Sequence, residues 1–252
     1  MNADPPCLYL DVGNTRTKLA RPVGGEGWDL LGAVPTEEQA VRDLLEEAAE
    51  KTGSREIRAC SVAPRLTTML EKRQRGRVTI FTSRDIPPSR TFHKPSTALG
   101  ADRFLLCAGA WSASGRRPAI VLGAGTALTI DLVHEDGRHL GGAILPGVET
   151  LRRGFHRAMP HLPEPPFERP GAWPATTTPN AIVWGLAGML GLAVDGLLER
   201  SRLRLIELGS DEPPELWLSG GDADRLADAV PGLAAARRDP YLLFRGLRQQ
   251  MW

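Results

Sequence analysis

The stretch that decides the fold is Asp11-Val12-Gly13-Asn14-Thr15-Arg16-Thr17-Lys18. An apolar run over residues 7–12 ends in a carboxylate and a glycine turn, and a second strand pattern covers residues 17–20, so the segment predicts a hairpin. Backbone N–H groups in such a turn can converge on an anion, and Asp11 offers the oxygen ligands that Mg²⁺ prefers. A purely structural hairpin is the alternative, because asparagine and glycine favour turns in any context.

A second stretch repeats this arrangement later in the chain, Gly123-Ala124-Gly125-Thr126-Ala127-Leu128-Thr129-Ile130-Asp131. Aligning the two turns pairs Gly13 with Gly125 and Thr17 with Thr129. The order of predicted elements repeats more clearly than the residues do. Strands over residues 7–12, 17–20 and 28–34 precede a helix over 37–51, and strands over 119–122, 127–133 and 138–145 precede a helix over 148–158.

Strands that alternate with helices predict a partly parallel α/β sheet in each half of the chain. Two such units with a central cleft form the ribonuclease-H-like, actin-type architecture of Hsp70 and of the acetate and sugar kinases. We therefore expect one domain over residues 1–97 and a second over residues 98–252. Two unrelated α/β halves are the alternative.

Several residues between the turns carry local expectations. Thr36 precedes the helix over residues 37–51 and is expected to cap it. His134 and His139 flank the turn at Asp136-Gly137 and are expected to be exposed. Residues 83–97 are proline-rich and predict a linker or binding loop, and residues 180–201 predict a long buried helix.

Composition restricts the class of protein. The chain has 252 residues, of which 42% are hydrophobic and 24% charged, as in ordinary globular proteins. A net charge of +1 supplies no strong field for nucleic acid. Cys7, Cys60 and Cys107 are too dispersed for a zinc site and are expected to be buried thiols of a cytoplasmic protein. We expect no membrane span, because no run of about 18 residues is uniformly apolar.

Four further motifs add polar groups at the ends of predicted elements. Leu99-Gly100-Ala101-Asp102-Arg103 places a carboxylate beside a guanidinium at a helix start, where simple capping is the alternative. The others are Gly141-Gly142-Ala143-Ile144-Leu145-Pro146-Gly147, Thr176-Thr177-Thr178-Pro179-Asn180-Ala181-Ile182, and Ser219-Gly220-Gly221-Asp222-Ala223.

Taken in order, these six segments resemble the type III pantothenate kinase family. That resemblance implies ATP-dependent phosphorylation of pantothenate to 4'-phosphopantothenate, at the start of coenzyme A biosynthesis, by a cytoplasmic homodimer that uses ATP, Mg²⁺ and a monovalent cation (K⁺ or NH₄⁺). Asp102 would be the general base, and Asp11 would hold Mg²⁺ through water. ATP would be bound by Thr126 and by the whole first turn, Asp11, Val12, Gly13, Asn14, Thr15, Arg16, Thr17 and Lys18. Pantothenate would be bound by Gly100, Ala101, Asp102, Arg103 and Thr178.

The chain departs from the family pattern at three positions. Gly123 stands where the family has an aspartate that helps bind the monovalent cation, and Phe92 stands where a tyrosine is expected. Met159-Pro160 replaces a common Thr-Ala pair. Two other functions therefore stay open at this point, a non-catalytic ligand-binding or regulatory relative and a kinase of the same architecture that acts on a sugar or acetate.

Overall fold

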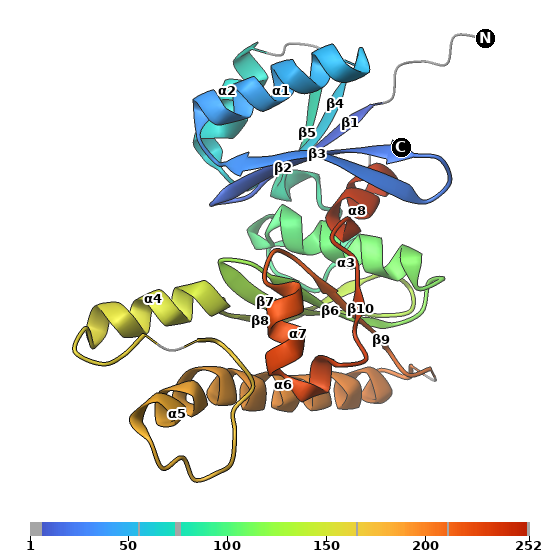
Figure 1. The fold of residues 1–252 in the computed structure, drawn as a ribbon. Coiled ribbons are helices and arrows are strands. Elements are labelled where there is room, and N and C mark those ends of the chain that lie inside the picture. The colour runs from blue at the N-terminus through green and yellow to red at the C-terminus, as the bar shows by residue number, and fades with distance from the viewer. Residues whose placement is uncertain (1–6, 55, 74–76, 165, 211, 251–252) are drawn as a thin grey trace. The chain divides into compact units, whose positions relative to one another are not determined.

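The computed structural model describes residues 7–54, 56–73, 77–164, 166–210 and 212–250. The chain forms two compact units, a first unit of Met1–Gly109 with Tyr241–Trp252 and a second unit of Ala110–Pro240 (Figure 1). The domain boundary predicted after residue 97 stays a prediction. The compact units divide later, because the start of helix α3 and the closing helix α8 both pack on the first sheet.

The first unit is built on a five-stranded sheet in the order β3-β2-β1-β4-β5. Its strands are β1 (Leu8–Val12), β2 (Arg16–Val23), β3 (Gly27–Pro35), β4 (Ile57–Ser61) and β5 (Val78–Phe81). The first three are antiparallel because short turns join them, whereas β4 and β5 run parallel to β1 after helical crossovers.

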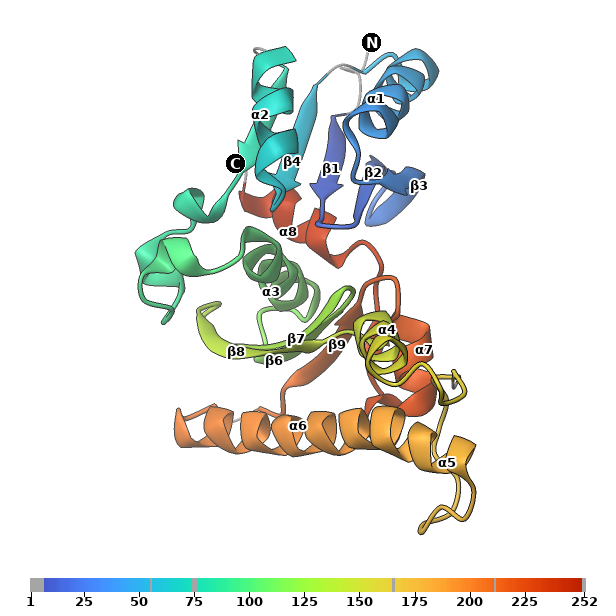
Figure 2. The same cartoon turned by 90° about the vertical axis from the view of Figure 1, so that its left-hand side faces the viewer.

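Helices cover both faces of this sheet (Figure 2). Helices α1 (Glu38–Thr52) and α2 (Pro64–Arg73) pack on one face, α1 through the helical spacing of Val41, Leu44, Leu45 and Ala48. The other face receives α3 (Ala101–Ala113) and α8 (Leu242–Gln250). Helices α3 and α8 cross closely, because a Cβ on Gly109 or on Gly246 would collide with the opposing backbone.

The second unit repeats this topology in a sheet of order β10-β9-β6-β7-β8. Its strands are β6 (Ala119–Ala124), β7 (Ala127–Val133), β8 (His139–Pro146), β9 (Glu215–Ser219) and β10 (Arg237–Arg238). Strands β6, β7 and β8 are antiparallel, β9 and β10 are parallel to β6, and both sheets have a register shift between their second and third strands. The predicted duplication is therefore confirmed.

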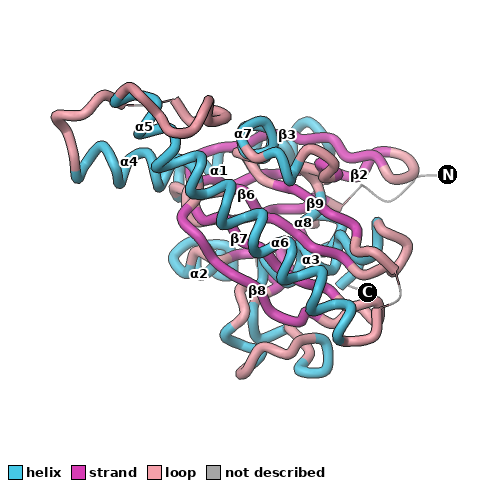
Figure 3. The backbone as a smooth tube through the Cα atoms, turned by 90° about the horizontal axis from the view of Figure 1, so that it is seen from below, coloured by secondary structure: helices cyan, strands magenta, loops and turns pink. Residues whose placement is uncertain are grey.

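One face of the second sheet is covered by α4 (Val148–Ala158), α5 (Thr178–Val183), α6 (Met189–Glu207) and α7 (Ala223–Ala229). A π-helical turn, Trp184–Gly188, joins α5 to α6. In Figure 3, which views the molecule from below, α6 runs across the strands of the second sheet. By length and composition the helix from Thr178 to Glu207 could span a membrane, but half of its most apolar window is buried inside the structure. The helix contributes Val194, Leu198 and Leu205 to the core of the second unit.

Several element boundaries differ from the predictions. Three short 3₁₀ turns (Ser83–Asp85, Pro88–Arg90 and Ser96–Ala98) occupy most of the predicted loop, and α3 begins at Ala101 rather than at residue 98. Strand β10 was not predicted, because two residues carry no periodic signal. Glu37, not Thr36, is the N-cap of α1, and its side chain makes no capping hydrogen bond.

Candidate functional site

The first glycine turn joins β1 to β2. Asp11 lies opposite Lys18 in the register of the two strands, and the Gly13 N–H donates to the Arg16 carbonyl over 3.2 Å. Asn14, Thr15 and Arg16 are exposed at the tip of the turn, whereas Thr17 is buried. The turn thus presents its polar tip to solvent from a strand pair fixed in the core.

Asp102 is the second residue of α3, where the positive end of the helix dipole stabilises a negative charge. Its carboxylate lies over Gly100, since a Cβ on Gly100 would be 2.6 Å from Asp102 Oδ1. The Phe104 N–H donates to the Gly100 carbonyl over 3.1 Å and fixes the start of the helix. A side chain at residue 100 would therefore displace the Asp102 carboxylate from this position.

Three predicted site residues of the first unit, Asp11, Lys18 and Asp102, lie close enough to interact electrostatically. Burial raises the pKa of Asp11 from 3.8 to about 7, the positive charge of Lys18 lowers it, and the nearby carboxylate of Asp102 raises it. A carboxyl group with a pKa this high is suited to a cation, because a bound metal ion would compensate for lost hydration and for the second carboxylate. These residues fit the predicted Mg²⁺ position.

Cys60 belongs to the same neighbourhood, although no sequence motif places it there. It pairs with Asp11 in the register of β1 and β4 and is buried. Burial raises the pKa of the Cys60 thiol well above its usual range, and the charges of Asp11 and Asp102 raise it further. Cys60 is therefore a protonated thiol. All three cysteines are free, but only Cys60 and Cys107 are buried as expected, whereas Cys7 is half-buried.

The second glycine turn, between β6 and β7, is tighter than the first. The Gly125 N–H donates to the Ala127 carbonyl over 3.1 Å, so this turn is one residue shorter. Gly123 consequently pairs with Thr129, in the position that corresponds to the pair of Asp11 and Lys18. The sequence alignment of Thr17 with Thr129 was wrong by one residue for this reason.

Two other glycine motifs meet the second turn inside the second unit. The Gly147 N–H and the Thr150 hydroxyl both donate to the Thr126 carbonyl, over 3.0 and 2.6 Å. The Asp222 N–H donates to the Ala124 carbonyl over 3.2 Å. A Cβ on Gly147 or on Gly220 would collide with the turn, and Gly220 has a φ of 117°. Segments far apart in sequence therefore converge on Thr126.

Thr178 lies apart from that turn as the first residue of α5. The Thr177 hydroxyl caps this helix by accepting the Asn180 N–H over 3.4 Å, which leaves Thr178 outside the capping interaction. Thr178 lines a cavity of about 500 Å³ together with Phe155, Leu162, Ala175, Thr176, Thr177, Ala181, Ile182 and Gly185. Its lining combines three threonines, Thr176 to Thr178, with mainly apolar residues.

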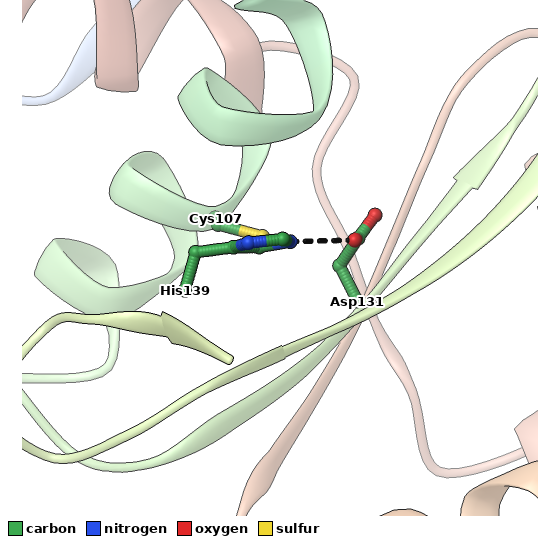
Figure 4. Close-up of side chains that lie close together, drawn as sticks. All are labelled: Cys107, Asp131 and His139. Atoms are coloured by element: carbon green, nitrogen blue, oxygen red, sulfur yellow. Dashed lines mark hydrogen bonds and ion pairs between the residues drawn. The ribbon is translucent and has the colours of Figure 1, made fainter. Parts of the chain in front are cut away.

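The prediction that His139 is exposed is wrong. Its side chain is buried, with 1% of its surface accessible, and Nε2 lies 2.8 Å from Asp131 Oδ1 (Figure 4). The turn at Asp136-Gly137 misled the prediction, because His139 is already the first residue of β8 and its side chain lies on a buried face of that strand. His134 is only half-buried.

A family profile described as type III pantothenate kinase matches residues 7–200. The chain belongs to the type III pantothenate kinase family. Among curated relatives, the type III pantothenate kinase of Stenotrophomonas maltophilia is 32% identical, with 94% of both chains covered. That of Chlorobium luteolum is 30% identical, with 96% of this chain and 92% of the relative covered.

Solved structures confirm the fold of this pantothenate kinase family member. A Campylobacter jejuni protein named for the Baf family of transcriptional activators superposes with a TM-score of 0.64 at 21% identity, covering 97% of this chain and 96% of that one. The activator of 2-hydroxyisocaproyl-CoA dehydratase from Clostridium difficile, with bound ADPNP, gives 0.54 at 11% identity, covering 98% and 96%. The duplicated ribonuclease-H-like, actin-type fold predicted from the sequence is thus confirmed.

Proposed function

We propose that this protein transfers the γ-phosphoryl group of ATP to the primary hydroxyl of pantothenate, forming 4'-phosphopantothenate in the first step of coenzyme A biosynthesis. Family membership supports the reaction. The observation that carries the proposal for this chain is the electrostatic coupling of Asp11, Asp102 and Lys18 in the first unit. A kinase needs a carboxylate for the attacking hydroxyl and another for the metal ion.

Each predicted residue has a role in this proposal. Asp102 orients the pantothenate hydroxyl and takes its proton, while Arg103 binds the pantothenate carboxylate with two parallel hydrogen bonds. The first turn and Thr126 bind the phosphates of ATP. Asp11 holds Mg²⁺ through water, and the metal ion would neutralise charge on the phosphates. Thr178 contacts pantothenate from the wall of its cavity.

The monovalent cation has the weakest support in this chain. Gly123 carries no carboxylate, and its cross-strand neighbours Thr129 and Ser219 offer only neutral hydroxyl groups. Neutral oxygen ligands can hold K⁺ or NH₄⁺, but without the attraction of a negative charge. The proposed enzyme therefore depends less on this cation than its relatives with aspartate do.

The homodimer is the proposed assembly, and the exposed side of α6 supports it. Leu192 and Ile206 are 69% and 67% accessible, although the helix is otherwise packed on the sheet. The exposed seam follows a spacing of three and four residues, as in helices that pair: Met189, Leu192, Gly196, Glu199, Leu203 and Ile206. An antiparallel copy would place Met189 against Ile206 and Leu192 against Leu203.

Light scattering after size exclusion tests this assembly. Leu192→Glu and Leu203→Glu would each bury an unpaired charge against a leucine of the second copy and are expected to give monomers. Arg200→Glu, an exposed charge change on the same helix beside the seam, is the control and should leave the dimer intact. A wild-type monomer, or dimers of both glutamate variants, would contradict pairing through α6.

A coupled assay of ADP release tests the reaction, with mass spectrometry of the product. We expect ADP release only when pantothenate is present, and a product heavier by one phosphoryl group. The retained Asp11, Asp102 and Arg103 favour this enzyme over a non-catalytic relative, and sugars and acetate serve as alternative acceptors in the same assay. ATP binding without turnover of any acceptor would contradict the proposal and favour the accessory protein. Three free thiols support a cytoplasmic location.

A further inference from the structure

Thr36 follows strand β3, outside all the motifs of the sequence, yet it makes three contacts with the first glycine turn. Its hydroxyl donates to the Gly13 carbonyl over 2.9 Å and lies 3.1 Å from the Thr17 hydroxyl. Its backbone N–H donates to the Thr15 carbonyl over 3.0 Å. The residue expected to cap α1 is therefore bonded to the turn instead.

These bonds set the direction of the peptide groups in the turn. A trans peptide is planar, and its N–H points away from its carbonyl. When Thr36 holds the carbonyls of Gly13 and Thr15, the N–H groups of Asn14 and Arg16 are directed to the opposite side of the turn. That side is where an anion would have to bind, and both residues are exposed.

The bond from the Gly13 N–H to the Arg16 carbonyl does not achieve this orientation by itself. It closes the ends of the turn. In the described part of the backbone, however, no N–H of the opposite strand donates to the Gly13 carbonyl. The Thr36 hydroxyl supplies that partner. A glycine turn has many accessible conformations, so one external hydrogen bond selects among them before a ligand arrives.

We propose that Thr36 is a positioning residue that pre-orients the first turn for the phosphates of ATP. This inference rests on the proposed function, in that ATP is the anion bound by residues 11–18. The turn contacts nucleotide in the ground state and the transition state alike, so loss of the hydroxyl raises KM for ATP more than it lowers kcat. Losing one or two neutral hydrogen bonds corresponds to about a tenfold change.

A purely structural role for Thr36 predicts a different outcome. If its hydroxyl only stabilised the end of β3, removal would lower the melting temperature without a selective effect on either substrate. The backbone N–H bond to Thr15 remains in every variant, so the end of the strand pair stays closed. A rise in KM for ATP without a rise in KM for pantothenate therefore distinguishes a positioning role of Thr36 from a purely structural one.

The test compares Thr36→Val, which keeps the shape and removes the hydroxyl, with Thr36→Ser, which keeps the hydroxyl. Thr52→Val is the matched control, because the Thr52 hydroxyl donates to the Ala48 carbonyl over 2.7 Å at the end of α1, away from the turn. We measure KM for each substrate, kcat, and the Kd of MgATP by calorimetry. Thr36→Ala replaces the valine variant if the valine variant does not fold.

We expect Thr36→Val to raise KM and Kd for ATP about tenfold with KM for pantothenate within twofold of wild type. Thr36→Ser should restore ATP binding to within about threefold, and Thr52→Val should change neither substrate. An unchanged ATP Kd in Thr36→Val, or equal rises for both substrates, would overturn the inference. If wild-type protein binds ATP but does not phosphorylate pantothenate, only the proposed reaction is overturned, because the Kd of MgATP still tests Thr36. If wild-type protein binds no ATP, both the proposed reaction and the role of Thr36 are overturned.

Discussion

The two glycine turns have the same place in two copies of one topology but differ in charge. The first has Asp11 opposite Lys18, with Asp102 close enough to raise the pKa of Asp11. The second has Gly123 opposite Thr129 and no charged side chain in those positions. The two units therefore share one backbone topology, but at these paired positions only the first unit has charged side chains.

The turns also differ in how they are held. Thr36 bonds two carbonyls of the first turn, whereas Gly147 and Thr150 both bond the single carbonyl of Thr126 in the second. The shorter second turn has fewer carbonyls to fix, and neighbouring glycines allow close backbone approach instead. The comparison predicts large effects from charge changes in the first unit and small ones in the second.

Asp102→Asn should have the largest effect, with kcat falling by about 10²–10⁴-fold while the fold is retained. An amide can accept a hydrogen bond but cannot take the proton of the attacking hydroxyl. Steady-state kinetics and circular dichroism of the purified variant check this expectation. An asparagine variant with more than about a tenth of wild-type kcat would remove Asp102 from the role of base.

Arg103→Ala should raise KM for pantothenate by about 100-fold, because the substrate carboxylate loses a bidentate partner worth roughly 3 kcal/mol. KM for ATP should stay within about threefold, since pantothenate binding alone is affected. Arg103→Lys keeps the charge but lacks the planar pair of donors, so its KM for pantothenate should lie between those of wild type and Arg103→Ala. Unchanged pantothenate KM would show that another group holds the carboxylate.

Asp11 should give kcat/KM for MgATP an inflection near pH 7. Its raised pKa means that the carboxyl group is neutral below pH 7, so a proton competes with the metal ion and the rate falls about tenfold per pH unit. Asp11→Asn should be slow and should lack this inflection. An inflection caused by titration of ATP itself would remain in that variant. A wild-type profile that is flat between pH 5.5 and pH 7 would contradict the raised pKa.

The same shift predicts the pH dependence of stability. Because the folded state binds a proton more tightly than the unfolded chain does, the contribution of Asp11 is most favourable below its ordinary pKa of 3.8 and is lost as pH rises to about 7. Wild-type protein should therefore lose stability across that interval relative to Asp11→Asn. Chemical denaturation at several pH values measures the difference without any substrate.

The sequence was sufficient for the order of elements, because that order depends on local periodicity and on the residue types at strand and helix ends. The roles of Asp11 and Asp102 stay predictions. The sequence was insufficient for Thr36, whose position before a helix is equally typical of a cap. It also failed for His139, since burial depends on which face of β8 meets the core. Contacts such as Thr150 with Thr126 join residues 24 positions apart and have no local pattern.

Gly123 gives the smallest expected effect and the sharpest test of the comparison. K⁺ should activate the wild-type enzyme less than about twofold, because the hydroxyl groups of Thr129 and Ser219 supply oxygen ligands without a negative charge. The measurement is kcat/KM in Tris buffer with no K⁺ and with saturating K⁺.

Gly123→Asp should restore activation by K⁺. Paired residues of neighbouring strands share a face of the sheet, so the new carboxylate would lie beside Thr129 and Ser219 and complete a charged set of ligands. Gly123→Asn adds similar bulk without the charge and is the matched control, which should not respond to K⁺. Strong activation of the wild-type enzyme would show instead that neutral ligands are enough to hold the cation. The charge difference between the two turns would then have no consequence for this ion, and only the carboxylates of the first unit would separate the two halves.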